Sequence, residues 1–196
     1  MLEWIQNHLV ELLGVVFSIA YLVLSIRQNI WLWPVGIASA VMYIVVFYQA
    51  KFYADMSLNG YYFLVSIYGW IHWSGAASPG RTVLPVTRII RKTGWLSFLA
   101  FAGIFAGSAV VLDNLTDSPL PWWDAFTTAG SVVATWMLAR KYLEHWLLWI
   151  IVDLVSMGLY IYKGLYPTAV LFLIYTLMAV VGFVRWKNQI VSNDTP

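Results

Sequence analysis

The sequence predicts an all-α integral membrane protein with seven transmembrane helices, and composition, hydropathy and length all point to this. Of its 196 residues, 61% are apolar and only 10% are charged, and the mean hydropathy is +0.75. A soluble protein needs a more polar surface, so this composition indicates that the lipid bilayer is the solvent. Because a helix needs about 20 residues to cross a bilayer, seven helices use nearly the whole chain. We expect one transmembrane domain, residues 1–196, with no room for a soluble catalytic domain.

Seven apolar runs, separated by charged residues, Pro and Gly, mark the helices in order. The runs are continuous rather than alternating, which excludes a strand-based membrane barrel. The first run carries Glu11 and has no basic segment before it, so we expect a retained helix rather than a removable signal peptide. Pro34 lies inside the second run, where a kink is expected, and Pro167 opens the seventh. The helices are expected near residues 8–26, 30–49, 55–75, 94–112, 122–140, 146–162 and 167–186.

The basic residues predict the orientation, because short cytoplasmic loops retain Lys and Arg. With the N-terminus outside, only Lys51 and Lys163 of the 11 basic residues face outwards. The loop VLDNLTDSPLP, with Asp113 and Asp117, then lies outside as well. We therefore expect the N-terminus outside and the C-terminus in the cytoplasm. The remaining basic residues, all cytoplasmic in this orientation, are Arg27, Arg81, Arg88, Arg91, Lys92, Arg140, Lys141, Arg185 and Lys187.

An internal repeat connects the two halves of the chain. The segment YQAKFYADMSLNGYYFLVSIYGWIHW resembles YKGLYPTAVLFLIYTLMAVVGFVRW, with Gly69 and Trp73 matching Gly182 and Trp186 at an offset of 113. The alternative is chance similarity between two apolar helices that end in Trp. A repeat would place three helices in residues 8–75, a linking helix in 94–112 and three more in 122–186. Both repeats would then have the same orientation, as in SWEET-like folds.

Several classes of function are disfavoured by what the sequence lacks. Without Cys there is no disulfide, thiolate or soft-metal site, and His8, His72 and His145 do not have metal-ligand spacing. No HExxH or GxSxG motif is present, so we expect no enzyme activity, no metal and no cofactor. The basic residues are scattered rather than gathered in a stripe, which argues against nucleic-acid binding. An oligomeric channel or a scaffold subunit remains an alternative to a carrier.

Three acidic residues fall inside the apolar runs, where a charge is expensive and therefore marks a candidate site. Glu11 and Asp124 each lie near the start of a helix, where hydrogen bonds or the positive helix end favour a structural or gating role. Asp153 is different, because it lies in WLLWIIVD with Trp146 and Trp149. On a helical wheel these three positions fall at about 340°, 0° and 300°, and Tyr160 at about 320°, so they share one face.

Such a face has two interpretations. Two indoles and a carboxylate can stack on a flat aromatic ligand and neutralise a positive charge. The alternative is an interfacial Trp pair beside an acid that bonds to a neighbouring helix. A second polar stripe, formed by Asn59, Tyr62, Ser66 and Trp73, lies along the third helix. It suits either the edge of a ligand or hydrogen bonding between helices.

The stretch PWWDAFTTAGSVVATWMLARKYLEHWLLWIIVDLVS, residues 121–156, resembles the Pnu family of vitamin transporters, and residues 47–73 carry a second resemblance. The resemblance covers nearly the whole chain. It implies a SWEET-like fold with a linking fourth helix, and facilitated diffusion of an unphosphorylated vitamin precursor that a cytosolic kinase then retains. In the family the two Trp of the WxxW motif flank the substrate, which matches Trp146 and Trp149 here.

Three positions depart from the nicotinamide riboside members of this family. Asp153 replaces an Asn, and Asn59 and Ser66 stand where those members tend to have Gln and Asn. Thiamine and nicotinamide riboside are both cationic aromatics, so stacking alone does not distinguish them. An acid that accepts from an amine, and fewer amides for sugar hydroxyls, favour thiamine, with nicotinamide riboside as the alternative. The expected location is the bacterial cytoplasmic membrane, as one chain or as a homo-oligomer.

Overall fold

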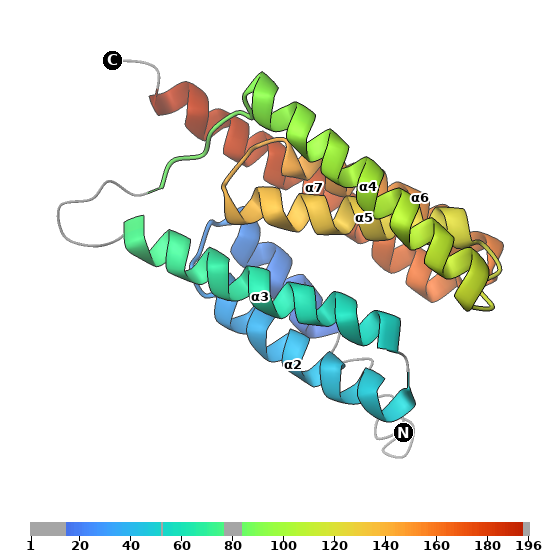
Figure 1. Ribbon diagram of the computed structural model, residues 1–196. Coiled ribbons are helices and arrows are strands. Elements are labelled where there is room, and N and C mark those ends of the chain that lie inside the picture. The colour runs from blue at the N-terminus through green and yellow to red at the C-terminus, as the bar shows by residue number, and fades with distance from the viewer. Residues whose placement is uncertain (1–14, 52, 77–83, 194–196) are drawn as a thin grey trace. The chain divides into compact units, whose positions relative to one another are not determined.

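The computed structural model describes residues 15–51, 53–76 and 84–193, and the chain divides into two compact units, Met1–Arg81 and Thr82–Pro196 (Figure 1). The described residues form seven helical segments. Apart from an isolated bridge between Thr87 and Tyr142, these residues contain no β structure. The prediction of an all-α protein is confirmed.

The first unit contains a helical segment, Val15–Ile26, followed by α2 (Leu32–Ala50) and α3 (Tyr53–Ala76). Helix α2 packs along α3. The expected kink at Pro34 is wrong, because Pro34 is the third residue of α2. A Pro in the first turn removes an N–H that has no partner inside the helix, so the helix begins there without bending.

The second unit contains α4 (Arg91–Leu115), α5 (Pro121–Ala139), α6 (His145–Tyr162) and α7 (Tyr166–Asn193). Helix α5 packs against both α4 and α6, and α6 packs against α7. Small residues allow this close approach: Ala125, Ala129 and Ala134 are fully buried. A Cβ on Gly130 would collide with Val152 of α6.

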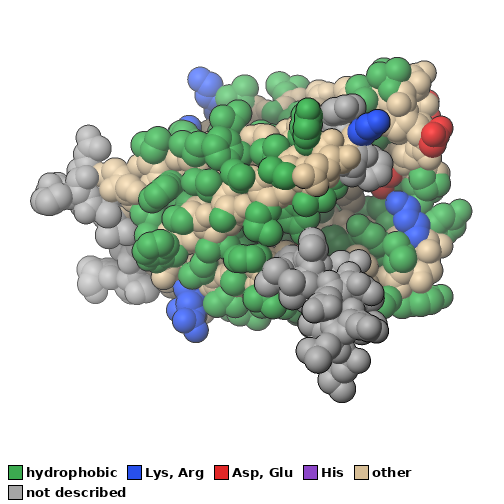
Figure 2. All heavy atoms as spheres, turned by 90° about the horizontal axis from the view of Figure 1, so that it is seen from below, with side chains coloured by type: hydrophobic (Ala, Val, Ile, Leu, Met, Phe, Trp, Pro, Cys, Tyr) green, Lys and Arg blue, Asp and Glu red, His purple; other side chains and the backbone are tan. Residues whose placement is uncertain are grey.

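Within the described residues, four helices are both long and apolar enough to cross a membrane: Leu32–Gln49, Arg91–Leu115, His145–Tyr162 and Tyr166–Ile190. Helices α3 and α5 have 24 and 19 residues, which is about the length of a bilayer crossing, but they are more polar. Figure 2 shows one face of the molecule, on which hydrophobic side chains predominate and charged side chains are few. This surface suits contact with lipid rather than water.

The ends of four helices share one backbone feature. Gln28, Lys51, Lys141 and Gly164 have φ angles of 53°, 61°, 54° and 72°, and each follows a helix by one or two positions. A left-handed residue at this position closes the helix by satisfying its last carbonyls. The repeat offset relates Gln28 to Lys141, and it also relates Lys51 to Gly164. The offset found in the sequence therefore recurs in the backbone.

The segment before α4 lies along the turn between α5 and α6. The Thr87 N–H donates to Lys141 O at 3.1 Å, and the Leu143 N–H donates to Thr87 O at 2.9 Å. Two side chains of the turn complete the contact: Lys141 Nζ donates to Leu84 O at 3.0 Å, and Glu144 Oε2 accepts from the Ile89 N–H at 2.9 Å. This contact fixes the start of α6, the helix that carries Asp153.

The buried Lys141 amine makes the stability of this contact depend on pH. Burial lowers the pKa of Lys141 from 10.5 to about 8. Between these two values the unfolded chain binds a proton that the folded chain does not, so stability rises with pH across this window. We expect the Tm of the wild type to rise relative to the Tm of Lys141→Met as the pH increases from 7 to 10. The exposed Lys187→Met serves as the control, and parallel Tm curves for wild type and Lys141→Met would contradict the prediction.

Candidate functional site

Asp153 is the central feature of the second unit. It lies in the middle of α6, and only 5% of it is exposed. Among the described residues, none donates a hydrogen bond to this carboxylate or forms an ion pair with it. Ser156, three positions further on, is also buried. An acid that is buried in a membrane helix and has no described partner is energetically unfavourable, which makes Asp153 a candidate binding site.

The two Trp of the WxxW motif have different environments. Trp146 is 1% exposed and packs edge-to-face on Trp186 of α7, with ring centroids 5.7 Å apart. A Cβ on Gly182 would lie 2.5 Å from Trp146 Cζ2, so the indole lies directly on the backbone of α7. Trp149 is partly exposed, and no described aromatic side chain stacks on it. Trp149 is also one turn from Asp153 on the same helix.

His145 is a buried residue whose packing role was not predicted from the sequence. It is fully buried beside Trp146 and Trp186, with ring centroids 4.5 and 4.8 Å away. Its Nδ1 lies 2.7 Å from Tyr142 O, and because a carbonyl only accepts, Nδ1 carries the hydrogen. The repeat offset relates His145 to Leu32, which is also fully buried. That relation was the signal that could have identified His145 as a core residue.

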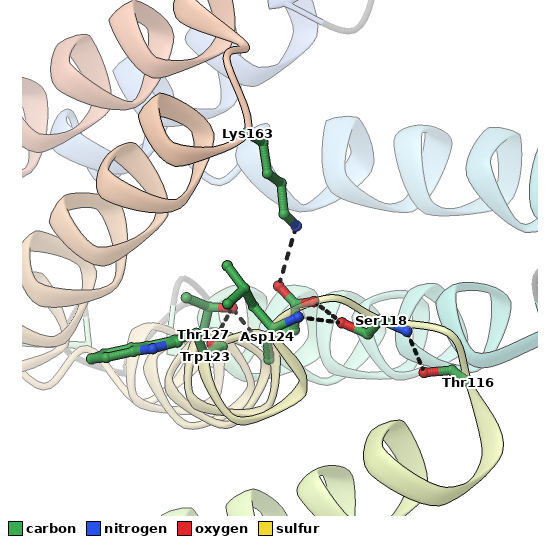
Figure 3. A network of polar contacts seen from close by, with 7 residues as sticks. Thr116, Ser118, Trp123, Asp124, Thr127 and Lys163 are labelled. Atoms are coloured by element: carbon green, nitrogen blue, oxygen red, sulfur yellow. Dashed lines mark hydrogen bonds and ion pairs between the residues drawn. The ribbon is translucent and has the colours of Figure 1, made fainter.

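Asp124, in the first turn of α5, belongs to a polar network near the C-terminal end of α6. Figure 3 shows Ser118 and Lys163 directed toward its carboxylate. Ser118 Oγ donates to Asp124 Oδ2 at 2.6 Å, and Lys163 Nζ lies 3.7 Å from Asp124 Oδ1. Both members of the ion pair are 31% exposed, so its contribution to stability is small. Tyr160 stacks on Phe172 of α7, with centroids 5.1 Å apart, and also interacts electrostatically with Asp124.

The predicted polar stripe of α3 divides into two parts. Ser66 is buried and lies near Gly36 of α2, where an added Cβ would be 3.0 Å from Ser66 Oγ and 3.1 Å from Tyr21 Cε2. Tyr62 is half-buried and interacts electrostatically with Tyr21. Ser66 and Tyr62 of the stripe therefore both lie near Tyr21 of the first helical segment.

The other residues that the sequence predicted for the first unit have different environments. Trp73 packs edge-to-face on Trp33 near the start of α2, with centroids 5.3 Å apart. Asn59 is half-buried. Glu11 lies outside the described residues. Within the part of the chain that the structure describes, no group of three or more His, Cys, Asp or Glu could hold a metal ion.

The apolar helices of membrane length define a multi-pass membrane protein, and the buried Asp153 is its candidate site. The sequence model described as "Nicotinamide mononucleotide transporter" matches residues 8–188. The chain belongs to this family, which is that of the Pnu vitamin transporters.

Two curated relatives and one solved structure are similar along most of the chain. The nicotinamide riboside transporter PnuC of Escherichia coli (strain K12) is 26% identical over 212 residues, covering 96% of this chain and 87% of the relative. The riboflavin/roseoflavin transporter RibM of Streptomyces davaonensis is 24% identical over 178 residues, covering 90% and 83%. The crystal structure of the vitamin B3 transporter PnuC matches with a TM-score of 0.69 at 24% identity, covering 91% of this chain and 80% of that one. That structure supports the helical fold.

Proposed function

We propose that this protein is a carrier for nicotinamide riboside, which it passes by facilitated diffusion across the cytoplasmic membrane of a bacterium. The observation that carries the proposal is Asp153, buried in α6 without a described partner. A buried carboxylate attracts a cation, and nicotinamide riboside is a pyridinium cation that also presents a flat ring to Trp149. The relatives named as nicotinamide riboside transporters support the same substrate.

The charge of Asp153 also distinguishes among the vitamins. Riboflavin, named for the Streptomyces relative, has a neutral ring, so Asp153 gives it no electrostatic advantage. A mononucleotide carries a phosphate, which a buried carboxylate repels. Thiamine is a cation, but the expectation that favoured it is less well supported than its alternative, because the similar relatives are named for nicotinamide riboside and riboflavin. Nicotinamide riboside is a cation without a phosphate, and it is the vitamin for which similar relatives are named.

We further propose that the two three-helix groups, which precede and follow α4 in the chain, are repeats, with the N-terminus outside. The four left-handed residues, which form two pairs related by the repeat offset, support the repeat. The distribution of basic residues supports the orientation. The chain has no Cys, so a single Asp117→Cys substitution gives a direct test: an impermeant maleimide should label it in intact cells. Labelling only after permeabilisation would overturn the orientation.

Uptake by the purified protein in liposomes tests the substrate. Labelled nicotinamide riboside should enter saturably, unlabelled nicotinamide riboside should compete at least about tenfold better than thiamine or riboflavin, and the internal concentration should stop at equilibrium. Saturable uptake of thiamine or riboflavin without nicotinamide riboside would reassign the substrate. Accumulation above equilibrium would contradict facilitated diffusion, and non-saturable flux would indicate a channel.

A further inference from the structure

Two tryptophans that are related by the repeat offset occupy the same local position in the two units. Trp33 is the second residue of α2 and Trp146 is the second residue of α6. They are 0% and 1% exposed, and they are among the largest fully buried side chains of the protein. Each belongs to the first turn of the middle helix of its three-helix group.

Each of these indoles lies on a glycine of the following helix. A Cβ on Gly69 of α3 would be 2.5 Å from Trp33 Cε2, and a Cβ on Gly182 of α7 would be 2.6 Å from Trp146 Cε2. No real Cβ tolerates such a contact, so these positions admit only glycine unless the indole moves. The same offset relates Gly69 to Gly182.

One turn after each glycine, a second Trp completes the contact. Trp33 and Trp73 meet at an interplanar angle of 89°, and Trp146 and Trp186 meet at 90°. Edge-to-face pairs of this kind add to the stabilisation that comes from burial of the rings. We name these two groups the Trp latches; the first consists of Trp33, Gly69 and Trp73, and the second of Trp146, Gly182 and Trp186.

Packing rather than hydrogen bonding holds these indoles in place. Trp33 Nε1 and Trp146 Nε1 are buried and have no hydrogen-bond partner among the described residues. An unsatisfied buried donor is unfavourable, so the fit of the ring on the glycine must outweigh that loss. An indole held in this way resists sliding of one helix along the other, because any shift brings a side chain into the place of the glycine.

We propose that the two Trp latches make α2–α3 and α6–α7 rigid helix pairs that move as units during transport, with Trp33 and Trp146 as matched positioning residues. This proposal rests on the carrier function proposed above. Carriers built from repeats work largely by rigid-body motion of one group of helices against another, which requires that the helices within each group keep their register. The second Trp latch also sets the rotation of α6 and therefore the direction of Trp149 and Asp153.

The first experiment compares Trp33→Phe with Trp146→Phe in the purified full-length protein. Both variants keep a buried aromatic ring but lose contact with the glycine. We expect both to bind nicotinamide riboside with a Kd within about threefold of the wild type, and both to lose about tenfold in maximal uptake rate. If Trp146→Phe instead raises the Kd at least tenfold while Trp33→Phe transports normally, Trp146 is a ligand platform and the proposal is wrong.

The second experiment is a double-mutant cycle on the Tm without ligand. Gly182→Ala should lower the Tm, and adding Trp146→Phe should recover at least half of the loss, because the smaller ring leaves space for the methyl group. Adding Trp33→Phe to Gly182→Ala should give no recovery. Gly103→Ala and Gly107→Ala are matched controls, because these two glycines of α4 face open space, and their Tm should not fall.

These two measurements separate the proposals from each other. If the wild type does not transport nicotinamide riboside, the substrate assignment fails. The Kd and the uptake rate of the Phe variants are then compared with those of the wild type for the vitamin that the wild type does transport. The cycle needs no vitamin at all. Equal recovery of Gly182→Ala by Trp33→Phe and by Trp146→Phe, or no recovery by either, would overturn the Trp latches.

Discussion

Replacement of Asp153 by Leu is expected to stabilise the protein while weakening the binding of its substrate. The carboxylate is 5% exposed and has no described partner, so a leucine of similar size removes an unfavourable buried charge. We expect the free energy of unfolding to rise by about 2 kcal/mol, which for a chain of this length raises the Tm by about 4–8 °C. Binding of nicotinamide riboside should weaken by about 10- to 100-fold, the value of one charged contact.

Two further variants make this prediction specific. Asp113→Leu removes a carboxylate that is exposed on α4, and it should change neither the Tm nor the Kd. Asp153→Asn retains the shape and hydrogen-bonding capacity but removes the charge, so it should also weaken binding of the cation. Thermal unfolding in detergent and a binding titration provide both readouts. A lower Tm for Asp153→Leu would mean that the carboxylate supports the fold, and its assignment to the substrate would fail.

Trp149→Ala and Trp146→Ala change the same motif but are expected to have different effects: the first should weaken substrate binding, and the second should destabilise the fold. Trp149 is partly exposed and no described ring stacks on it, so its removal should raise the Kd about 10- to 100-fold, in line with about 1–3 kcal/mol for stacking. Trp146 is buried between α6 and α7, so its removal leaves a cavity. The expected loss of stability is about 3–5 kcal/mol.

Each of the two variants is the control for the other. Trp149→Phe extends the comparison, because a smaller ring should keep part of the stacking and give an intermediate Kd. Binding titrations and thermal unfolding on the same preparations separate the two effects. Equal increases in Kd for Trp149→Ala and Trp146→Phe would mean that both indoles contact the vitamin, as the family resemblance implies.

Several helix bounds could be predicted closely, because hydropathy is a local property. The sixth helix was expected over 146–162 and is observed at His145–Tyr162. The seventh was expected to end at 186 and continues to Asn193. Hydropathy detects the part of a helix that lies in lipid, and the polar residues after Trp186 extend this helix beyond it. The contact of residues 84–89 with the α5–α6 turn leaves no periodic pattern, because it joins groups that are distant in the chain, such as the Ile89 N–H and the Glu144 carboxylate.

The sequence proposed the residues of the candidate site, but it did not predict how their side chains are oriented. A helical wheel places Trp146 on the same side of α6 as Asp153. The wheel does not say that the indole of Trp146 turns toward α7. That direction depends on Gly182, whose missing side chain provides the space for the ring.

Composition and the pattern of residues along the chain were enough to indicate the membrane environment, the order of the helices and the family, and to predict a repeat offset. Helix packing was needed to show that Trp146 is buried against α7 while Trp149 is partly exposed. It was also needed to show that the Asp153 carboxylate has no described partner. These features depend on contacts between helices that are distant in the chain. Hydropathy does not distinguish a side chain that faces lipid from one that packs against a glycine of a neighbouring helix.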